Sequence, residues 1–311
     1  MRLTAFQKSL CFGLLFLAIN AHSFGQVQLT GDKYEIPFSW QVDTSNGFVE
    51  PHAAMLIPVK LPGCAKQFYM QFDMGAPKTV FYNPVCNLIG KKYPGVISIT
   101  DTSRNIAEIV IKPGKQSIQL QNVALMNTGA KNIDWSNNAS IIIGTIGSDW
   151  LQNRTVMINY PKKRIVLNYE VPENYKESMT DFTYVQNSIL LPVTINGKKT
   201  VLFFDTGSSA FSLLTSKETA LAMADKDATA LRYPVQSWGR TMYANSLPSS
   251  DSIEINKLKI PLEKVTYMEG ASESQVNRML QLGIGGMTGN KLFFKHRLIL
   301  DTRGKKFMVI K

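Results

Sequence analysis

Short apolar or alternating segments of four to eight residues recur along most of the chain, separated by Gly, Pro, Asn and Asp. Alternation with a period of two and short apolar runs bounded by turn residues predict β-strands. Only the segment from Ser216 to Ala224 combines a capping serine with a run of strong helix formers, so we expect a helix there. The pattern therefore predicts an all-β protein.

Two of the predicted strands end in the same way. Residues 201–204 form an apolar run that stops at Asp205, and residues 68–72 form a similar run that stops at Asp73, 132 residues earlier. In each case a glycine follows two residues later, which permits the chain to turn sharply. An aspartate in such a turn often only satisfies nearby backbone groups. A buried strand can also deliver the carboxyl group to a desolvated position where its pKa is perturbed.

The surroundings of the two aspartates repeat as well. Leu56-Ile57-Pro58-Val59 precedes the first aspartate much as Leu190-Leu191-Pro192-Val193 precedes the second. Downstream, Gly144-Thr145-Ile146-Gly147 and Gly286-Met287-Thr288-Gly289 lie 142 residues apart. We therefore interpret the chain as an internal tandem duplication with one aspartate in each half.

The motif Phe204-Asp205-Thr206-Gly207-Ser208-Ser209, with an apolar-apolar-Gly element further on, resembles the pepsin-like (bilobal) aspartic protease family. The short halves are closer in length to retropepsins. The resemblance implies two pseudo-twofold-related pepsin/retropepsin-like β-barrel lobes with a cleft between them, and Asp73 and Asp205 as the catalytic pair. It also implies that an apolar-apolar-Gly segment crosses behind each loop, namely residues 142–144 and 284–286, with 281–283 as an alternative register.

The resemblance further identifies residues that support the two active-site loops. These are Gly75, Ala76, Thr206, Gly207 and Ser208. In the family, the residue after each aspartate is usually a threonine whose hydroxyl bonds backbone across the pseudo-twofold axis. Thr206 matches this pattern, but Met74 does not. Because a thioether cannot donate a hydrogen bond, we expect one link between the lobes to be missing.

Two hairpins are candidates for substrate contacts. Residues 96–111 are expected to form a hairpin around a polar turn, which by position corresponds to the flap over the cleft. Thr102 and Ser103 lie at its tip, where the tyrosine and neighbouring glycine of pepsin-like flaps are missing. Trp238 and Gly239 lie where a second hairpin would face the cleft, although such aromatic residues more often serve in packing.

The composition of the N-terminal residues is typical of an export signal. Residues 1–25 contain Arg2 and Lys8, then an apolar core at residues 10–19, then small and polar residues. This order is typical of a secretory signal peptide, and the core is too short to span a membrane. We expect an exported bacterial protein, periplasmic or extracellular, with an N-terminal lobe at residues 26–169, a linker at 170–182 and a C-terminal lobe at 183–311.

The net charge of the chain and its potential metal-ligating residues limit the partners and cofactors that we expect. Removal of residues 1–25 lowers the net charge from +11 to +9, and the basic residues are scattered without interleaved aromatic residues, so we expect no nucleic-acid partner. The three histidines lack a metal-ligand pattern, so we expect no metal and no cofactor. Cys64 and Cys86 form either a disulfide or two buried free thiols. We expect a monomer that takes a peptide or protein substrate.

The favoured function is that of a secreted aspartic endopeptidase. Two adjacent carboxyl groups share one proton, so one can act as base on a water molecule while the other acts as acid. The main alternative is a pepsin-fold protein that binds peptides or another ligand, with activity weakened or lost through Met74 and the atypical flap. A third possibility is another hydrolytic or carbohydrate-binding role, which carboxyl groups about 5 Å or more apart would favour.

Overall fold

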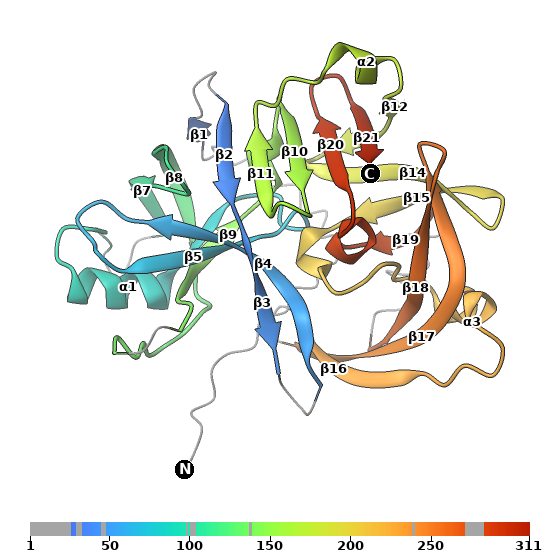
Figure 1. The fold of residues 1–311 in the computed structure, drawn as a ribbon. Helices are drawn as coiled ribbons and strands as arrows, with labels where there is room; N and C mark the ends of the chain where they lie inside the picture. Colours follow the sequence, from blue (N-terminus) through green and yellow to red (C-terminus); the bar gives the residue numbers. More distant parts are fainter. Residues whose placement is uncertain are drawn as a thin grey trace.

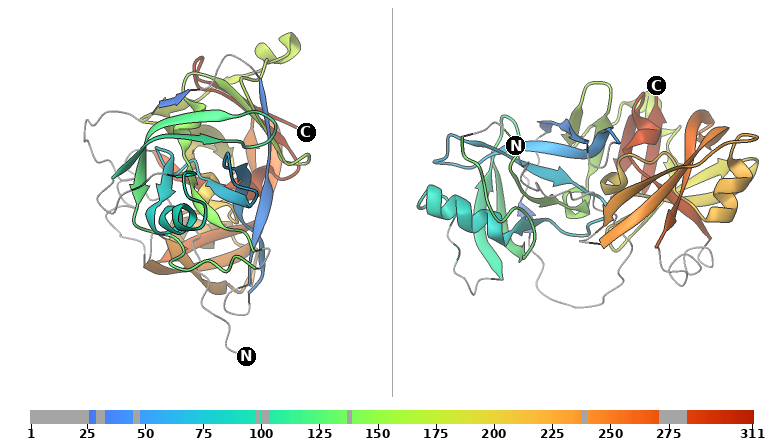
Figure 2. Two further views of the ribbon diagram at one scale, coloured as in Figure 1. Left: turned by 90° about the vertical axis from the view of Figure 1, so that its left-hand side faces the viewer. Right: turned by 90° about the horizontal axis from the view of Figure 1, so that it is seen from below.

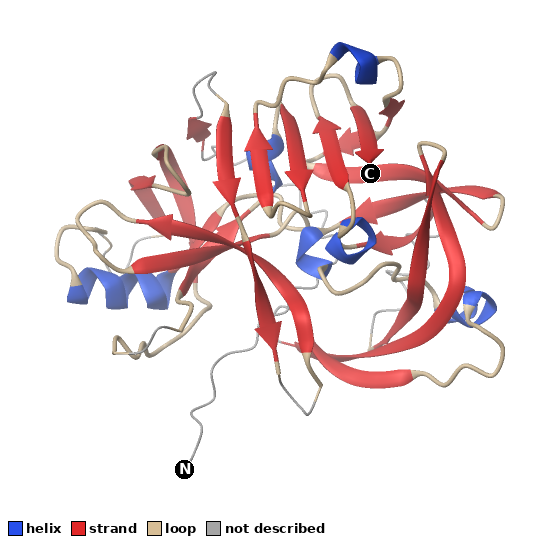
Figure 3. Ribbon diagram, in the orientation of Figure 1, coloured by secondary structure: helices blue, strands red, loops and turns tan. Residues whose placement is uncertain are grey.

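The computed structural model describes residues 26–28, 33–44, 48–97, 99, 104–136, 139–237, 240–270 and 283–311. The expected signal peptide lies outside these residues. The fold is predominantly β, with three sheets and a few short helices (Figure 1, Figure 3). Among the described residues, no helix has the length and apolar character needed to cross a membrane.

Each half of the chain builds one large sheet. The first sheet has eight strands in the order β1-β8-β6-β9-β5-β4-β3, with β7 added at β8. Its strands are β1 (Gln26–Gln28), β3 (Ser39–Asp43), β4 (Glu50–Lys60), β5 (Gln67–Phe72), β6 (Val80–Tyr82), β7 (Asn105–Ile111), β8 (Ile118–Met126) and β9 (Ile142–Ile146).

The sheet of the second half has seven strands in the order β16-β17-β14-β15-β19, with β13 added at β14 and β18 at β17. Its strands are β13 (Thr183–Val185), β14 (Ser188–Ile195), β15 (Lys198–Phe204), β16 (Leu231–Ser237), β17 (Arg240–Ile255), β18 (Leu258–Glu269) and β19 (Ile284–Thr288).

A six-stranded sheet joins the two halves. It lies across the top of the molecule in Figure 1, between the two large sheets, which remain on opposite sides in the view from below in Figure 2. Met157 and Ile299, which are equivalent in the repeat, pair with each other at the centre of β10 and β20, as a local twofold axis requires. The strand order is β12 (Thr180–Asp181), β21 (Lys306–Ile310), β20 (Arg297–Asp301), β10 (Thr155–Asn159), β11 (Arg164–Leu167) and β2 (Tyr34–Pro37).

The strands that carry the aspartates are paired in matching registers. β5 pairs in parallel with β9, and β15 pairs in parallel with β19. In both pairs the register shifts by one residue, so that Gly144 lies opposite Met70 and Gly286 opposite Leu202. Residues 284–286 are therefore the structural counterpart of residues 142–144, and residues 281–282 of the alternative register lie outside the described part of the chain.

The helices include one that the sequence pattern did not predict. The predicted helix after Ser216 is confirmed as α3 (Lys217–Met223), and Ser216 caps it by accepting a hydrogen bond from Thr219 N. α1 (Asn83–Lys92) was missed. The remaining helical segments are short: α2 (Glu173–Lys176) and the 3-10 turns η2 (Ser148–Leu151), η3 (Thr206–Ser208) and η4 (Asn290–Phe293).

Of the predicted hairpin at residues 96–111, the second strand is confirmed as β7, the start of the first strand is not, and residues 98 and 100–103 lie outside the described part of the chain. Val96 and Ile97 lie in the turn after α1, and Ile97 is buried against the apolar core instead of alternating along a strand. β7 begins only at Asn105 and pairs with β8, with Ile111 opposite Ile118. Burial of Ile97 from a turn produces the same apolar spacing as a strand, so the pattern was misleading.

Both cysteines of the described chain are buried free thiols. Cys64 and Cys86 form no disulfide with each other. Burial raises the pKa of the Cys86 thiol to about 12. Of the two alternatives for these cysteines, the structure has the free thiols.

Candidate active site

Asp73 and Asp205 are held in equivalent places at the ends of β5 and β15. The backbone N–H of Asp73 donates to the carbonyl of Ile146 at 2.9 Å, and that of Asp205 donates to the carbonyl of Thr288 at 2.9 Å. Both aspartates are fully buried. Each half therefore delivers one carboxyl group from a strand end that is tied to the strand beside it.

The two loops meet so closely that each glycine faces the opposite aspartate. Gly75 N donates to Asp73 Oδ1 at 3.0 Å and to Asp205 Oδ1 at 2.9 Å, and Gly207 N donates to Asp205 Oδ1 at 2.8 Å. A Cβ atom at Gly75 would lie 2.6 Å from Asp205 Oδ1, and one at Gly207 would lie 2.5 Å from Asp73 Oδ1. Both positions therefore require glycine, and the carboxyl groups belong to one site.

A hydroxyl group links the second loop to the first. Thr206 Oγ1 donates to the carbonyl of Phe72 at 2.8 Å and accepts from Met74 N at 2.8 Å. Met74 is buried in the apolar core and has no hydroxyl to return this pair of bonds. The link between the loops is therefore one-sided, as the substitution of threonine by methionine predicted.

The second loop has more support than the first. Ser208 Oγ donates to Asp205 Oδ2 at 2.9 Å. Asn290 Nδ2 donates to the carbonyl of Thr206 at 2.9 Å and to Ser209 Oγ at 3.1 Å, while Asn290 Oδ1 accepts from Tyr160 Oη at 2.8 Å. Asn290 is fully buried, so its amide holds the loop from behind.

The first loop is held differently at the matching position. Ser148, 142 residues before Asn290, donates from its backbone N–H and its hydroxyl to the carbonyl of Ala76, at 2.9 and 3.2 Å. Ala76 thus supports the loop through its backbone. Asn290 and Tyr160 were missed from the sequence. A comparison of the halves at the 142-residue offset would have shown an amide in one half and a serine in the other.

The surroundings of the two carboxyl groups raise both pKa values, but unequally. Burial raises the pKa of Asp73 well above its usual range and the charge of Asp205 raises it further, while backbone hydrogen bonds from Gly75 and Ala76 oppose the rise. Burial also raises the pKa of Asp205, but hydrogen bonds from Ser208, Gly207 and Gly75 oppose the rise. The Asp205 carboxyl group accepts from Gly207 N, Gly75 N and Ser208 Oγ, whereas that of Asp73 accepts from Gly75 N, so Asp205 is better stabilised as the carboxylate.

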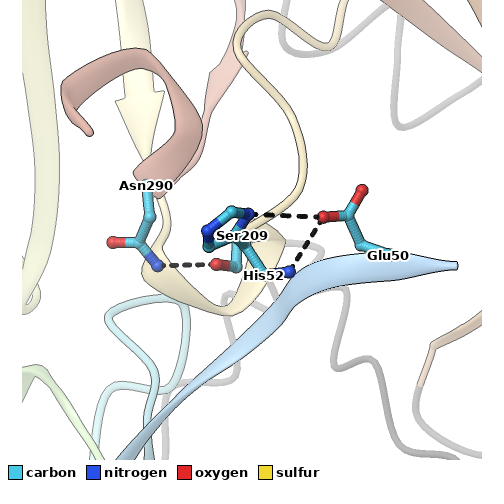
Figure 4. A network of polar contacts seen from close by, with 4 residues as sticks. All are labelled: Glu50, His52, Ser209 and Asn290. Carbon is cyan, nitrogen blue, oxygen red and sulfur yellow. Dashed lines mark hydrogen bonds and ion pairs between the residues drawn. The ribbon is translucent and has the colours of Figure 1, made fainter. Parts of the chain in front are cut away.

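A histidine near the second loop does not form a nucleophile-base pair with Ser209. His52 N donates to Glu50 Oε1 at 3.0 Å, and Figure 4 draws this pair together with Ser209 and Asn290. The His52 ring packs 4.4 Å from the ring of Phe294. The hydrogen bonds of the described residues include none between His52 and Ser209, and Ser209 is fully buried. The His52 ring packs on Phe294, and its Nδ1 lies 3.9 Å from Glu50 Oε1.

The predicted substrate contacts cannot be placed. Thr102, Ser103, Trp238 and Gly239 lie outside the described residues. β16 and β17 do form the expected hairpin that leads to residues 238–239. Within the described part of the chain, no group of three or more His, Cys, Asp or Glu side chains is arranged to hold a metal ion.

No protein-family model matches the chain. No curated protein matches it in sequence either.

Proposed function

We propose that this protein is an exported aspartic endopeptidase with two pepsin-like lobes, in which Asp73 and Asp205 activate a water molecule. The observation that carries the proposal is the single N–H of Gly75, which lies within 3.0 Å of one carboxyl oxygen of each aspartate. Two buried carboxyl groups this close cannot both ionise readily, so they share a proton. Such a pair supplies an acid and a base at one point.

The unequal hydrogen bonding assigns roles to the pair. Asp205, as the carboxylate, takes a proton from water while the water oxygen attacks the peptide carbonyl carbon. Asp73 gives its proton to the carbonyl oxygen, which produces a tetrahedral diol. When the diol collapses, the C–N bond breaks, the leaving nitrogen takes the proton from Asp205, and a hydroxyl proton returns to Asp73.

Several features support this proposal over a glycosidase-like pair. The backbone N–H of Gly75 donates to both carboxyl groups, at 3.0 and 2.9 Å, which favours a directly shared proton over the carboxyl separation of about 5 Å or more that glycoside hydrolysis requires. Asp73 Oδ2 is buried and has no hydrogen-bond partner among the described residues, which suits an atom that contacts a reactant.

A peptide-binding protein without turnover is the second candidate. The one-sided link from Thr206, with Met74 in place of a second hydroxyl, favours it because the first loop is held less rigidly. Catalysis depends on placement of the carboxyl groups, and a loosely held pair loses rate before it loses binding. The intact Asp73 is the feature that argues for the peptidase.

The test is hydrolysis of a mixed peptide library by the chain from residue 26 onward. We expect cleavage by the wild-type protein and by Asp251→Asn, since Asp251 is a peripheral carboxylate that accepts from Asn196. Asp73→Asn and Asp205→Asn should each abolish cleavage while the circular dichroism spectrum is retained. Cleavage by either folded dyad variant would refute the mechanism, and binding without cleavage by wild type would favour the second candidate.

A further inference from the structure

Each large sheet has one face that packs on the main core and a second face that lies beside the aspartates. On β5 the side chains of Phe68, Met70 and Phe72 belong to the main apolar core. Because successive side chains of a strand point to opposite faces, Gln71 lies on the other face, the one that leads to Asp73. On β15 the same alternation places Phe203 opposite the core residues Leu202 and Phe204.

Gln71 and Phe203 are each the middle residue of a row of three residues on neighbouring strands. Leu56 of β4 and Thr145 of β9 flank Gln71 in the first sheet, and Leu190 of β14 and Met287 of β19 flank Phe203 in the second. The rows occupy equivalent places in the two halves. They therefore border the two sides of the proposed site.

The two rows differ in chemistry. Phe203 and Met287 belong to a separate apolar cluster with Phe211 and Met242. In the first row, Thr145 Oγ1 is hydrogen-bonded to Tyr82 Oη at 2.7 Å. Gln71 is only 2% exposed, and its Nε2 is buried without a hydrogen-bond partner among the described residues. Burial of an amide donor without an acceptor is unfavourable in free energy, so a ligand that supplies an acceptor removes this penalty when it binds.

We propose that Gln71 determines which side chain a substrate can place on the Asp73 side of the cleaved bond. That side chain carries a neutral hydrogen-bond acceptor, such as the carboxamide of Gln or Asn, and the side chain on the Asp205 side is apolar. A neutral acceptor is preferred to a carboxylate because the proton-sharing pair already carries one negative charge. This inference rests on the proposed function.

The preference is measurable with two peptides that differ only by Gln or Leu at the residue on the Asp73 side of the cleaved bond. We expect the wild-type protein to cleave the Gln peptide at least about tenfold faster in kcat/KM, since buried polar groups discriminate strongly against partners that leave them unpaired. Gln71→Leu, or Gln71→Met if that variant folds poorly, should abolish or reverse the ratio. An unchanged ratio in a folded variant would overturn the assignment.

Gln67→Leu is a matched control on the same face of the same strand. Gln67 Nε2 already donates to the carbonyls of Val59 and Phe68, at 2.7 and 2.9 Å, so its removal should leave the ratio unchanged. A change of the ratio by this control equal to that of Gln71→Leu would also overturn the assignment.

Binding of two uncleavable hydroxyethylene peptides, which carry the same Gln or Leu, can be measured by calorimetry. This measurement tests the role of Gln71 independently of the proposed peptidase activity. Preferential binding of the Gln peptide that Gln71→Leu removes, with no cleavage of any peptide, would refute the peptidase and support the role of Gln71. Cleavage with a ratio that ignores Gln71 would do the reverse. Equal or absent binding by both peptides, with no cleavage, would overturn both.

Discussion

The hydroxyl of Thr206 links the two aspartate loops both as a donor and as an acceptor. Thr206→Val keeps the shape of the side chain but removes both 2.8 Å bonds, to the carbonyl of Phe72 and from Met74 N. All three residues are buried, so water does not replace the lost partners. At about 1–3 kcal/mol for each buried group left unsatisfied, we expect destabilisation by about 2–6 kcal/mol.

The matched control is Thr288→Val. Thr288 is equally buried, and its Oγ1 donates to the carbonyl of Ser212 at 2.8 Å within the second half. This variant leaves one carbonyl without that donor, so we expect a loss of about 1–3 kcal/mol. The expected difference in stability between Thr206→Val and Thr288→Val corresponds to roughly 2–12 °C in Tm for a chain of this size.

Thermal unfolding of both variants decides the question, with hydrolysis of peptides as a second readout. We expect Thr206→Val to unfold at a lower temperature than Thr288→Val and to lose activity. The activity falls because the carboxyl groups are no longer held in one geometry. Equal Tm losses in the two variants would show that Thr206 is an ordinary buried hydroxyl and would refute the cross-link.

Three further predictions concern the groups around the aspartates. Asn290→Ala leaves the Thr206 carbonyl without this donor and the Tyr160 hydroxyl without its acceptor, so we expect the free energy of unfolding to fall by about 2–6 kcal/mol in chemical denaturation; an unchanged midpoint would contradict this. Ser208→Ala removes a donor that lowers the pKa of Asp205, so the acidic limb of the kcat/KM profile should move to higher pH, and an unmoved limb would be evidence against this role. Because the pKa values of both aspartates are raised on folding, the unfolded chain binds fewer protons above about pH 3.9, and the stability from the protonated pair is lost as pH rises through the folded pKa values. Asp73→Asn should therefore raise Tm at neutral pH and have little effect near pH 3, and equal shifts at both pH values would rule this out.

Much of the site was readable from the sequence because it depends on local patterns that occur twice. An apolar run that ends at Asp-x-Gly indicates a strand end and a turn, and the second copy at a fixed offset indicates that the two are related. The missing hydroxyl at Met74 followed from side-chain chemistry alone. These features need no knowledge of tertiary contacts.

The sequence-based predictions failed where tertiary packing determines the structure of a segment. α1 buries Val85, Cys86 and Ile89 on one face, but its short apolar pattern, with Pro84 near the start and Gly90 inside, resembles the strands around it. Asn290 lies between Gly289 and Lys291, where no local pattern predicts burial, and its contacts across the second loop explain why it is buried.

The measurement that tests the central claim most directly is the pH profile of peptide hydrolysis from acidic to neutral pH, with and without pepstatin, beside Asp73→Asn. We expect cleavage that rises and falls with pH because one proton is shared between the two aspartates. We also expect pepstatin to inhibit this cleavage and Asp73→Asn to lack it. Cleavage that persists in Asp73→Asn, or folded wild-type protein that cleaves no peptide at any pH, would contradict the central claim.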